Sequence, residues 1–181
     1  MANDREKRID EMLARQDIID CLSRICRGSD RCDRELFLSA HHDDAIVAAG
    51  PFVGGPVELY DWADALQAQT YTATAHTLLN NTFDFDGDTA HVETYYIFVG
   101  CMGEETNLIA GGRYIDRFER RDGVWGLAMR NNFVEWTSAV PAMGNPLGEI
   151  ADLELNGLPA RGKDDVSYQR PLVNRRAINI P

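Results

Sequence analysis

The chain has 181 residues, a length typical of a single domain with one hydrophobic core. Its 18 basic and 29 acidic residues give a formal net charge of −11, and such a surface repels the phosphates of nucleic acids. The 44% of hydrophobic and 26% of charged residues exclude a wholly disordered or fibrous chain. No apolar run approaches the roughly 18 residues of a membrane span, and the charged start MANDREKRID is unlike a signal peptide. We therefore expect a cytoplasmic globular protein that binds neither nucleic acid nor membrane.

The cysteines favour free thiols over a disulfide framework or a zinc site. Cys21, Cys26, Cys32 and Cys101 form no CxxC pair, and their density is far below that of a disulfide scaffold. We expect them to be small buried side chains.

The N-terminal part of the chain has the spacing of amphipathic helices. Between about residues 4 and 27 the apolar stripe contains Ile18, Leu22 and Ile25. Gly28 is a candidate C-terminal cap, and a second short helix is expected to run through residues 36–38. Asp30 then falls at a helix boundary.

A short strand and a third helix follow. Residues 45–49 are apolar and predict a strand, and the Gly-Gly-Pro sequence at 54–56 predicts a break before the next helix. In that helix Leu59, Trp62 and Leu66 share one face, and we expect this face to be part of the core.

From Tyr71 onward the apolar period changes from helical to strand spacing. Turn signals at Asp86-Gly87, Gly103-Glu104 and Asp122-Gly123 divide the segment into strands near 74–85, 89–101, 107–120 and 124–137. Long antiparallel strands of this kind curl strongly, and helices that cover the concave face enclose a pocket. The sequence predicts an α+β fold, a cone-shaped barrel-like sheet closed by N-terminal helices, over residues 1–140.

The C-terminal extension has a different composition. Residues 141–181 contain several prolines and glycines without a sustained apolar period. We expect this segment to wrap around the domain or around a neighbouring subunit.

The histidines limit the search for an acid–base site. His41 and His42 in HHDD point in diverging directions and match no standard metal-ligand spacing, and His91 beside a turn is expected to face solvent. His76 shares a strand face with Leu78 and Asn80, where a neutral buried imidazole or a carboxylate-paired base are both possible. Spacing alone does not choose Asp30 from the other acidic residues as its partner.

Common cofactor motifs are absent from the sequence. DFDGD lacks the remaining residues of an EF-hand, with Tyr95 at the position of the bidentate glutamate, and it is better explained by a hairpin turn. The sequence has no GxxxxGK[ST], GxGxxG, GxSxG or HExxH. We expect chemistry without a cofactor or metal.

The order of several segments nevertheless resembles a known family. RQDIIDCLSRICRGSD, TAHTLLNNTFDFDGDTAHV and the hairpin GGRYIDRFERRDGVWGLAMRNN are similar to the SnoaL-like branch of the nuclear transport factor 2-like superfamily, over roughly residues 8–140. Within it, the chain looks most similar to scytalone dehydratase, bile acid 7α-dehydratase and hexachlorocyclohexane dehydrochlorinase. The resemblance implies a catalytic pair formed by Asp30 and His76, with Arg130 on the last strand as a further catalytic residue.

One position departs from these lyases. Where the dehydrochlorinase has a lysine and the bile acid enzyme a tyrosine, this chain has Ile25, so the contact to the leaving group is not carried over. Tyr95 and Tyr114 are the candidate replacement donors, and each can equally be a core or rim residue. The expected substrate-binding residues are Ile25, Tyr95, Ile97, Tyr114 and Asn132.

Two classes of function follow. The first is a cofactor-independent lyase in which His76 removes a carbon-bound proton from a small apolar, cyclic substrate; a ketosteroid-isomerase-like isomerase is a variant of it. The second is a non-catalytic small subunit of a ring-hydroxylating dioxygenase, which has the same fold. Either function is compatible with self-association, and the resemblance favours a homotrimer.

Overall fold

The computed structural model describes residues 2–103 and 105–178. The helices are α1 (Ala2–Asp30), α2 (Arg34–Leu38) and α3 (Pro56–Thr70), followed late in the chain by the 3-10 turns η1 (Leu153–Asn156) and η2 (Val166–Tyr168). The strands are β1 (His41–Ala49), β2 (Phe52–Gly54), β3 (Ala73–Asp86), β4 (Thr89–Cys101), β5 (Thr106–Arg121) and β6 (Val124–Pro141). The fold is therefore α+β, as the sequence predicts.

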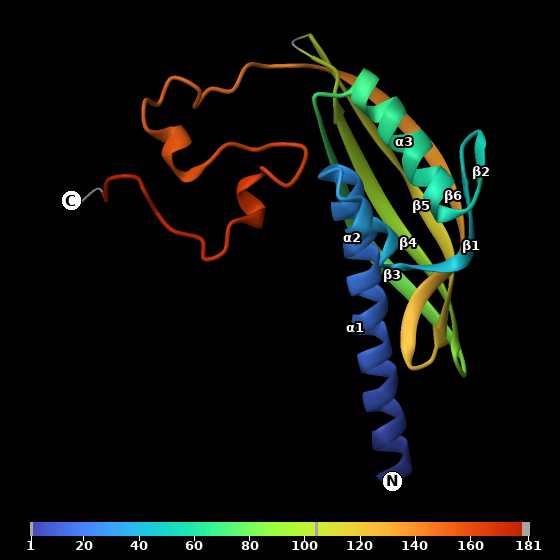
Figure 1. Ribbon diagram of the computed structural model, residues 1–181. Coiled ribbons are helices and arrows are strands. Elements are labelled where there is room, and N and C mark those ends of the chain that lie inside the picture. Colours follow the sequence, from blue (N-terminus) through green and yellow to red (C-terminus); the bar gives the residue numbers. More distant parts are fainter. Residues whose placement is uncertain (1, 104, 179–181) are drawn as a thin grey trace.

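The strands form one curved sheet in the order β2-β1-β6-β5-β4-β3. The predicted meander is confirmed: β3, β4, β5 and β6 pair antiparallel in succession, and β6 extends to residue 141, beyond the expected end at 137. β1 adds to β6 in parallel. Because β2 and β3 are two separate edges, the sheet curves without closing into a barrel. α1 and α3 lie against the same face of this sheet (Figure 1).

β1 is longer than the strand expected at 45–49 and begins at His41. Its first four residues, HHDD, are polar and give no strand signal in the sequence, and the antiparallel pairing of β1 with β2 is a further feature that the sequence does not predict. The parallel pairing with β6 brings Val47 beside Arg130 and Ala49 beside Asn132. β1 therefore lies next to the strand that carries the polar candidate residues.

α1 contributes the centre of the core through Ile18, Cys21 and Leu22, each at most 1% exposed. Its last turns lie beside β3 and β6, whereas its N-terminal half projects beyond the sheet (Figure 1). The apolar stripe predicted for this helix is confirmed. No described helix is long and apolar enough to cross a lipid bilayer.

Gly28 does not cap α1, because the helix continues to Asp30. A Cβ atom at residue 28 would lie 2.6 Å from the backbone nitrogen of Phe37 in α2. The glycine therefore permits the close approach of α2, and the turn after α1 is made by Cys32, whose φ is 49°. Asp30 thus belongs to the last turn of α1.

The predicted core face of α3 is only partly buried. Leu59 is 8% exposed and contributes to the core, but Trp62 is 37% and Leu66 is 49% exposed. Trp62 instead stacks on Phe52 of β2, with ring centroids 5.4 Å apart. The expectation that all three residues are core is therefore wrong for Trp62 and Leu66, because α3 covers the rim of the sheet.

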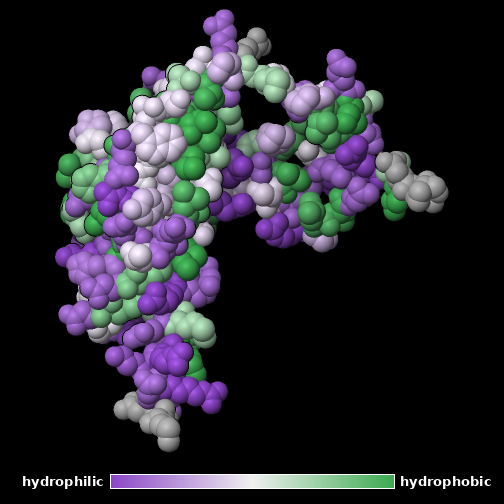
Figure 2. All heavy atoms as spheres, turned by 180° about the vertical axis from the view of Figure 1, so that it is seen from behind, coloured by the Kyte–Doolittle hydropathy of each residue, from purple (hydrophilic) through white to green (hydrophobic). Residues whose placement is uncertain are grey.

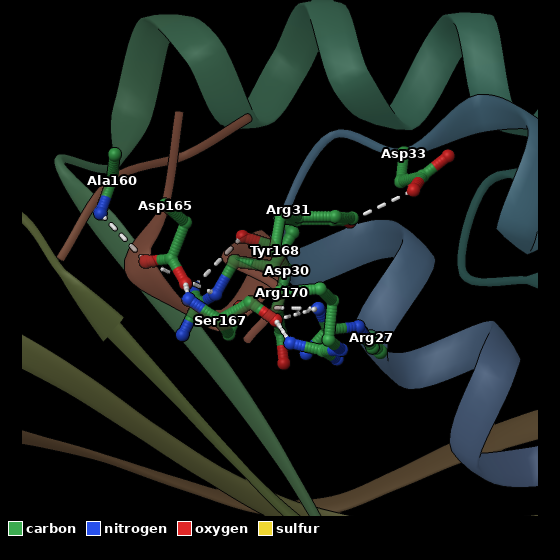
Figure 3. A network of polar contacts seen from close by, with 9 residues as sticks. All are labelled: Arg27, Asp30, Arg31, Asp33, Ala160, Asp165, Ser167, Tyr168 and Arg170. Atoms are coloured by element: carbon green, nitrogen blue, oxygen red, sulfur yellow. Dashed lines mark hydrogen bonds and ion pairs between the residues drawn. The ribbon is translucent and has the colours of Figure 1, made fainter. Parts of the chain in front are cut away.

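The segment after β6 leaves the sheet and returns to the corner where α1, α2 and α3 meet (Figure 1). Tyr168 donates a hydrogen bond of 2.8 Å to Oδ2 of Asp33, the residue that caps α2. Arg161 donates to Gln67 Oε1 at 3.0 Å, and Ser167 accepts from Arg27 (Figure 3). Residues 160–170 are thereby fixed to the helices.

Candidate active site

Asp30 and His76 lie in direct contact between the end of α1 and the start of β3. Oδ1 of Asp30 is 2.7 Å from His76 Nδ1, and Oδ2 accepts a hydrogen bond of 2.8 Å from the backbone N–H of the same residue. Their side chains are only 12% and 16% exposed. The two contacts fix both the carboxylate and the strand to which the imidazole belongs.

The electrostatics of this contact favour an ionised carboxylate. Burial alone would raise the pKa of Asp30, but the hydrogen bonds and charge of His76 outweigh it, and the pKa lies below its ordinary value. An ionised Asp30 accepts a hydrogen bond from Nδ1–H, so the tautomer that this contact selects has its lone pair on Nε2. Phe98 packs on the ring with centroids 4.8 Å apart and restricts its rotation.

An inner cavity of about 190 Å³ lies between the helices and the concave face of the sheet. Its polar lining comes from several elements and includes His76, Arg130, Tyr114 and Asn132. Its apolar lining consists of Ile25, Phe37, Val47, Ala49, Leu59, Trp62 and Ala63. A small apolar molecule with a few polar groups fits such a site.

Arg130 forms a buried ion pair within this lining. Its Nε and Nη2 donate to the two carboxylate oxygens of Asp116 at 2.8 and 2.7 Å, and the guanidinium lies 3.9 Å from the centre of the Tyr114 ring. Burial would lower the pKa of Arg130, but the Asp116 carboxylate raises it above its ordinary value, so the group stays charged. Within residues 2–103 and 105–178 no acceptor binds Nη1, which leaves this donor for a ligand.

The predicted substrate-binding residues divide into two groups. Ile25, Tyr114 and Asn132 line the inner cavity. Tyr95 and Ile97 do not: they lie on the outer face of β4, where Tyr95 is 44% exposed. Their predicted role is wrong because the strand alternates in the opposite phase.

Tyr96 and Phe98 alternate with these two residues and lie on the inward face of β4, which also contains the buried Ala90, Val92 and Thr94. Tyr96 stacks on Tyr114 at 4.2 Å and donates a hydrogen bond of 2.9 Å to Asn132 Oδ1. Polar His91 and Glu93 share a face with Tyr95, a sequence signal that identifies that face as the outer one. Tyr96 therefore positions Asn132, which lines the inner cavity.

His41 lines the inner cavity although the sequence does not single it out from the HHDD cluster. Its Nδ1 lies 2.9 Å from the carbonyl oxygen of Phe37, and its ring lines the inner cavity. Burial lowers the pKa of His41 to about 4, so the ring is neutral near pH 7. His42 binds the Glu119 carbonyl instead, and the two imidazoles do not converge on one ligand. No cluster of three or more potential metal-ligating side chains occurs in the described part of the chain.

A second, outer cavity of about 440 Å³ lies between α1 and β3. It shares Cys26 and His76 with the inner cavity, and Asp30 lies on its wall. Burial raises the pKa of Cys26 to about 12, so this shared thiol is neutral and a poor nucleophile. The outer lining consists of Ser23, Cys26, Arg27, Asp30, Arg31, His76, Thr77 and Leu78.

Solved structures with the same fold include several enzymes. A hexachlorocyclohexane dehydrochlorinase (LinA, type 2) is 23% identical, with a TM-score of 0.70 over 76% of this chain and 97% of its own. A proposed scytalone dehydratase from Novosphingobium aromaticivorans is 19% identical, with a TM-score of 0.63 over 75% of this chain and 96% of its own. A proposed aromatic ring hydroxylase from the same organism is 20% identical, with a TM-score of 0.62 over 70% and 92% of the two chains.

These identities establish a common fold and leave the reaction open. None of the curated protein sequences compared with the chain is significantly similar to it. Residues 10–131, which contain Asp30, His76 and Arg130, match the SnoaL-like domain. The chain therefore belongs to the SnoaL-like domain family of the nuclear transport factor 2-like superfamily.

Proposed function

We propose that this protein is a cofactor-independent lyase that removes a proton from carbon and expels water or halide from a small, mostly apolar substrate. The observation that carries the proposal is the contact of 2.7 Å between Asp30 and His76 Nδ1 on the wall of the inner cavity. This contact leaves Nε2 as the basic ring nitrogen. The fold shared with a dehydrochlorinase and a proposed dehydratase supports the same reaction class.

The proposed step is a 1,2-elimination. Nε2 of His76 takes the proton, the electrons of the C–H bond form the new double bond, and the neighbouring C–X bond breaks with its electrons on X. Asp30 stabilises the imidazolium that forms, while the free Nη1 of Arg130 stabilises the developing charge on X. When X is hydroxyl, the imidazolium proton completes the departing water; when X is chloride, the proton is released to solvent.

The Arg130–Asp116 pair is suited to this charge-stabilising role. Asp116 accepts hydrogen bonds from two of the guanidinium nitrogens, and the Tyr114 ring covers one face of the planar guanidinium. The orientation of the Arg130 side chain is therefore fixed before a substrate binds. The tyrosine hydroxyls of residues 96 and 114 remain protonated, because burial raises the pKa of each. They are therefore donors and do not serve as bases.

The experiment is a turnover screen with hydroxylated, halogenated and keto cyclic compounds. On any substrate found, we expect His76→Ala to lower kcat by about 100- to 10,000-fold, the usual contribution of a general base. His91→Ala is the matched control, because His91 is an exposed histidine on β4 outside both cavities. A wild-type rate for His76→Ala contradicts the proposal.

The outcome of the screen separates the proposed elimination from the two alternatives, an isomerase and a non-catalytic subunit. A ketosteroid-isomerase-like reaction shifts a double bond and keeps every substituent, whereas the proposed reaction loses HX. The fold shared with a proposed aromatic ring hydroxylase supports the alternative of a non-catalytic dioxygenase subunit. That alternative predicts no turnover in the screen and a stable complex with a larger iron-containing subunit.

Self-association, with a homotrimer favoured, is part of the proposal. On the outer face of the sheet, pairing places Tyr95 and Phe133 on either side of Arg113, and Ile97 and Trp136 on either side of Gly111. Tyr95, Phe133 and Trp136 are 44–50% exposed, and Figure 2 shows apolar residues among polar ones on the side of the molecule opposite that of Figure 1. A paired apolar face of this kind is typical of an interface. Light scattering that finds only a monomer contradicts this part of the proposal.

We also propose that the protein is located in the cytoplasm.

A further inference from the structure

The outer cavity has an unusual charge for this protein. The chain carries a formal net charge of −11, yet the outer cavity is lined by Arg27 and Arg31. The one carboxylate in its wall, Asp30, already has both oxygens bound to His76. The arginines are therefore not neutralised by the cavity wall itself.

Arg27 is held in place without an acidic partner. Its Nη2 donates to Ser167 Oγ at 3.0 Å, and its guanidinium lies 4.6 Å from the centre of the Tyr168 ring. No ion pair of Arg27 is present among residues 2–103 and 105–178. Arg170 donates to the same Ser167 carbonyl that Arg27 approaches, so two positive groups lie at one acceptor (Figure 3).

Arg31 is only partly compensated. Its Nη1 donates to the backbone oxygen of Asp30 at 3.2 Å, and its Nε lies 3.8 Å from Asp165 Oδ2, beyond hydrogen-bond distance. The Asp165 carboxylate is itself bound by the backbone N–H groups of Ala160 and Ser167. Arg31 is 30% exposed and keeps donors available to a ligand.

The two cavities differ in character but share part of their lining. The inner one is mainly apolar, whereas the outer one presents two guanidinium groups, and both share Cys26 and His76. Guanidinium groups bind carboxylates through paired hydrogen bonds, which distinguishes them from a general positive potential. A ligand that reaches from one cavity to the other past His76 would place an apolar body in the inner cavity and an acidic group beside the arginines of the outer one.

We propose that the substrate is an amphipathic carboxylic acid whose apolar body occupies the inner cavity and whose carboxylate binds Arg27 and Arg31 in the outer cavity. This arrangement presents the carbon between the two parts to His76. The inference rests on the proposed function for the role of His76, but the anion site itself is tested by binding alone.

The test compares cyclohexanecarboxylate with cyclohexanecarboxamide, a neutral molecule of nearly the same shape. Binding is measured by calorimetry with the full chain at low salt. We expect the carboxylate to bind at least about tenfold more tightly, as charge-assisted hydrogen bonds require. Arg27→Gln and Arg31→Gln should each weaken carboxylate binding about tenfold and leave amide binding unchanged.

Two controls make the result specific. Arg34→Gln removes an arginine that is paired with Asp61 outside both cavities, and it should leave the affinities for the carboxylate and for the amide unchanged. Arg27→Met removes the same guanidinium from above the Tyr168 ring but introduces no polar amide, so agreement between the two Arg27 variants attributes the loss to the guanidinium and not to the new side chain. Circular dichroism establishes that each variant is folded.

The outcomes separate this inference from the proposed function. Retained carboxylate preference in His76→Gln supports the anion site whether or not that variant turns over a substrate. Equal affinity for the two probes, binding of neither probe, or a preference that survives both arginine substitutions overturns the inference. A wild-type turnover rate in His76→Gln overturns the proposed function and leaves the anion site standing.

Discussion

Replacing Asp116 by asparagine tests whether Arg130 depends on a buried carboxylate for its charge. The side chains of Arg130 and Asp116 are 6% and 0% exposed, and two hydrogen bonds of 2.8 and 2.7 Å join them. Removing one partner leaves a charge in the interior without compensation, which typically costs about 3–5 kcal/mol of stability. For a urea m-value of about 2 kcal/mol/M, the midpoint of unfolding should fall by about 2 M.

The assay is urea unfolding at one fixed protein concentration, because self-association also changes apparent stability. Asp61→Asn is the control: Asp61 pairs with Arg34 at 3.1 Å, but the side chains are 61% and 46% exposed. Such an exposed pair contributes at most about 1 kcal/mol. The double variant Asp116→Leu with Arg130→Met should recover most of the lost stability, since an apolar pair replaces the ion pair, and it should remain inactive. A loss below 1 kcal/mol for Asp116→Asn refutes the reasoning.

The remaining predictions concern the close approach of the helices and the buried imidazole of His41. Gly28→Ala should cost about 1–3 kcal/mol of unfolding free energy, because its Cβ meets the Phe37 backbone at 2.6 Å; Gly144→Ala, with open space around it, is the control in the same denaturation assay. His41 has its pKa lowered from 6.5 to about 4 by burial, so its contribution to stability is complete above pH 6.5 and is lost as the pH falls towards 4. The loss is about 3 kcal/mol between these limits. His41→Gln should therefore show a flatter stability profile than the wild type over pH 4–7, and parallel profiles count against a neutral buried His41.

Much of the fold follows from local pattern. The helical stripe of α1 and the turn dipeptides of the hairpins predict the first helix and the antiparallel meander, because period and turn chemistry are local properties. The parallel pairing of β1 with β6 joins residues that are far apart in the sequence, such as Val47 and Arg130, which are 83 positions apart, and no local signal specifies it. The expected cap at Gly28 failed for a similar reason: the glycine is required by a tertiary contact with α2.

The candidate site shows the same division. The family resemblance predicts that Asp30, His76 and Arg130 belong to one site, whereas residue spacing alone does not select one of the many acidic residues as the partner of His76. Tyr95 and Tyr96 are adjacent aromatic residues, so an error of one residue in strand phase moves the predicted donor to the outer face. Asp116 lies between Tyr114 and Phe118 on the same inward face of β5, and a buried carboxylate there requires a positive partner. That signal was present in the sequence, but the partner, Arg130, is identified only by the pairing of β5 with β6.

The central claim is that Asp30 and His76 act as one catalytic unit, and a double-mutant cycle tests it most directly. On a substrate from the turnover screen, kcat is measured for His76→Ala, for Asp30→Asn and for the double variant. Residues that act together lose most of their rate with the first substitution, so the double variant should be within a fewfold of His76→Ala alone. A wild-type rate in His76→Ala, or losses that multiply in the double variant, would contradict the account.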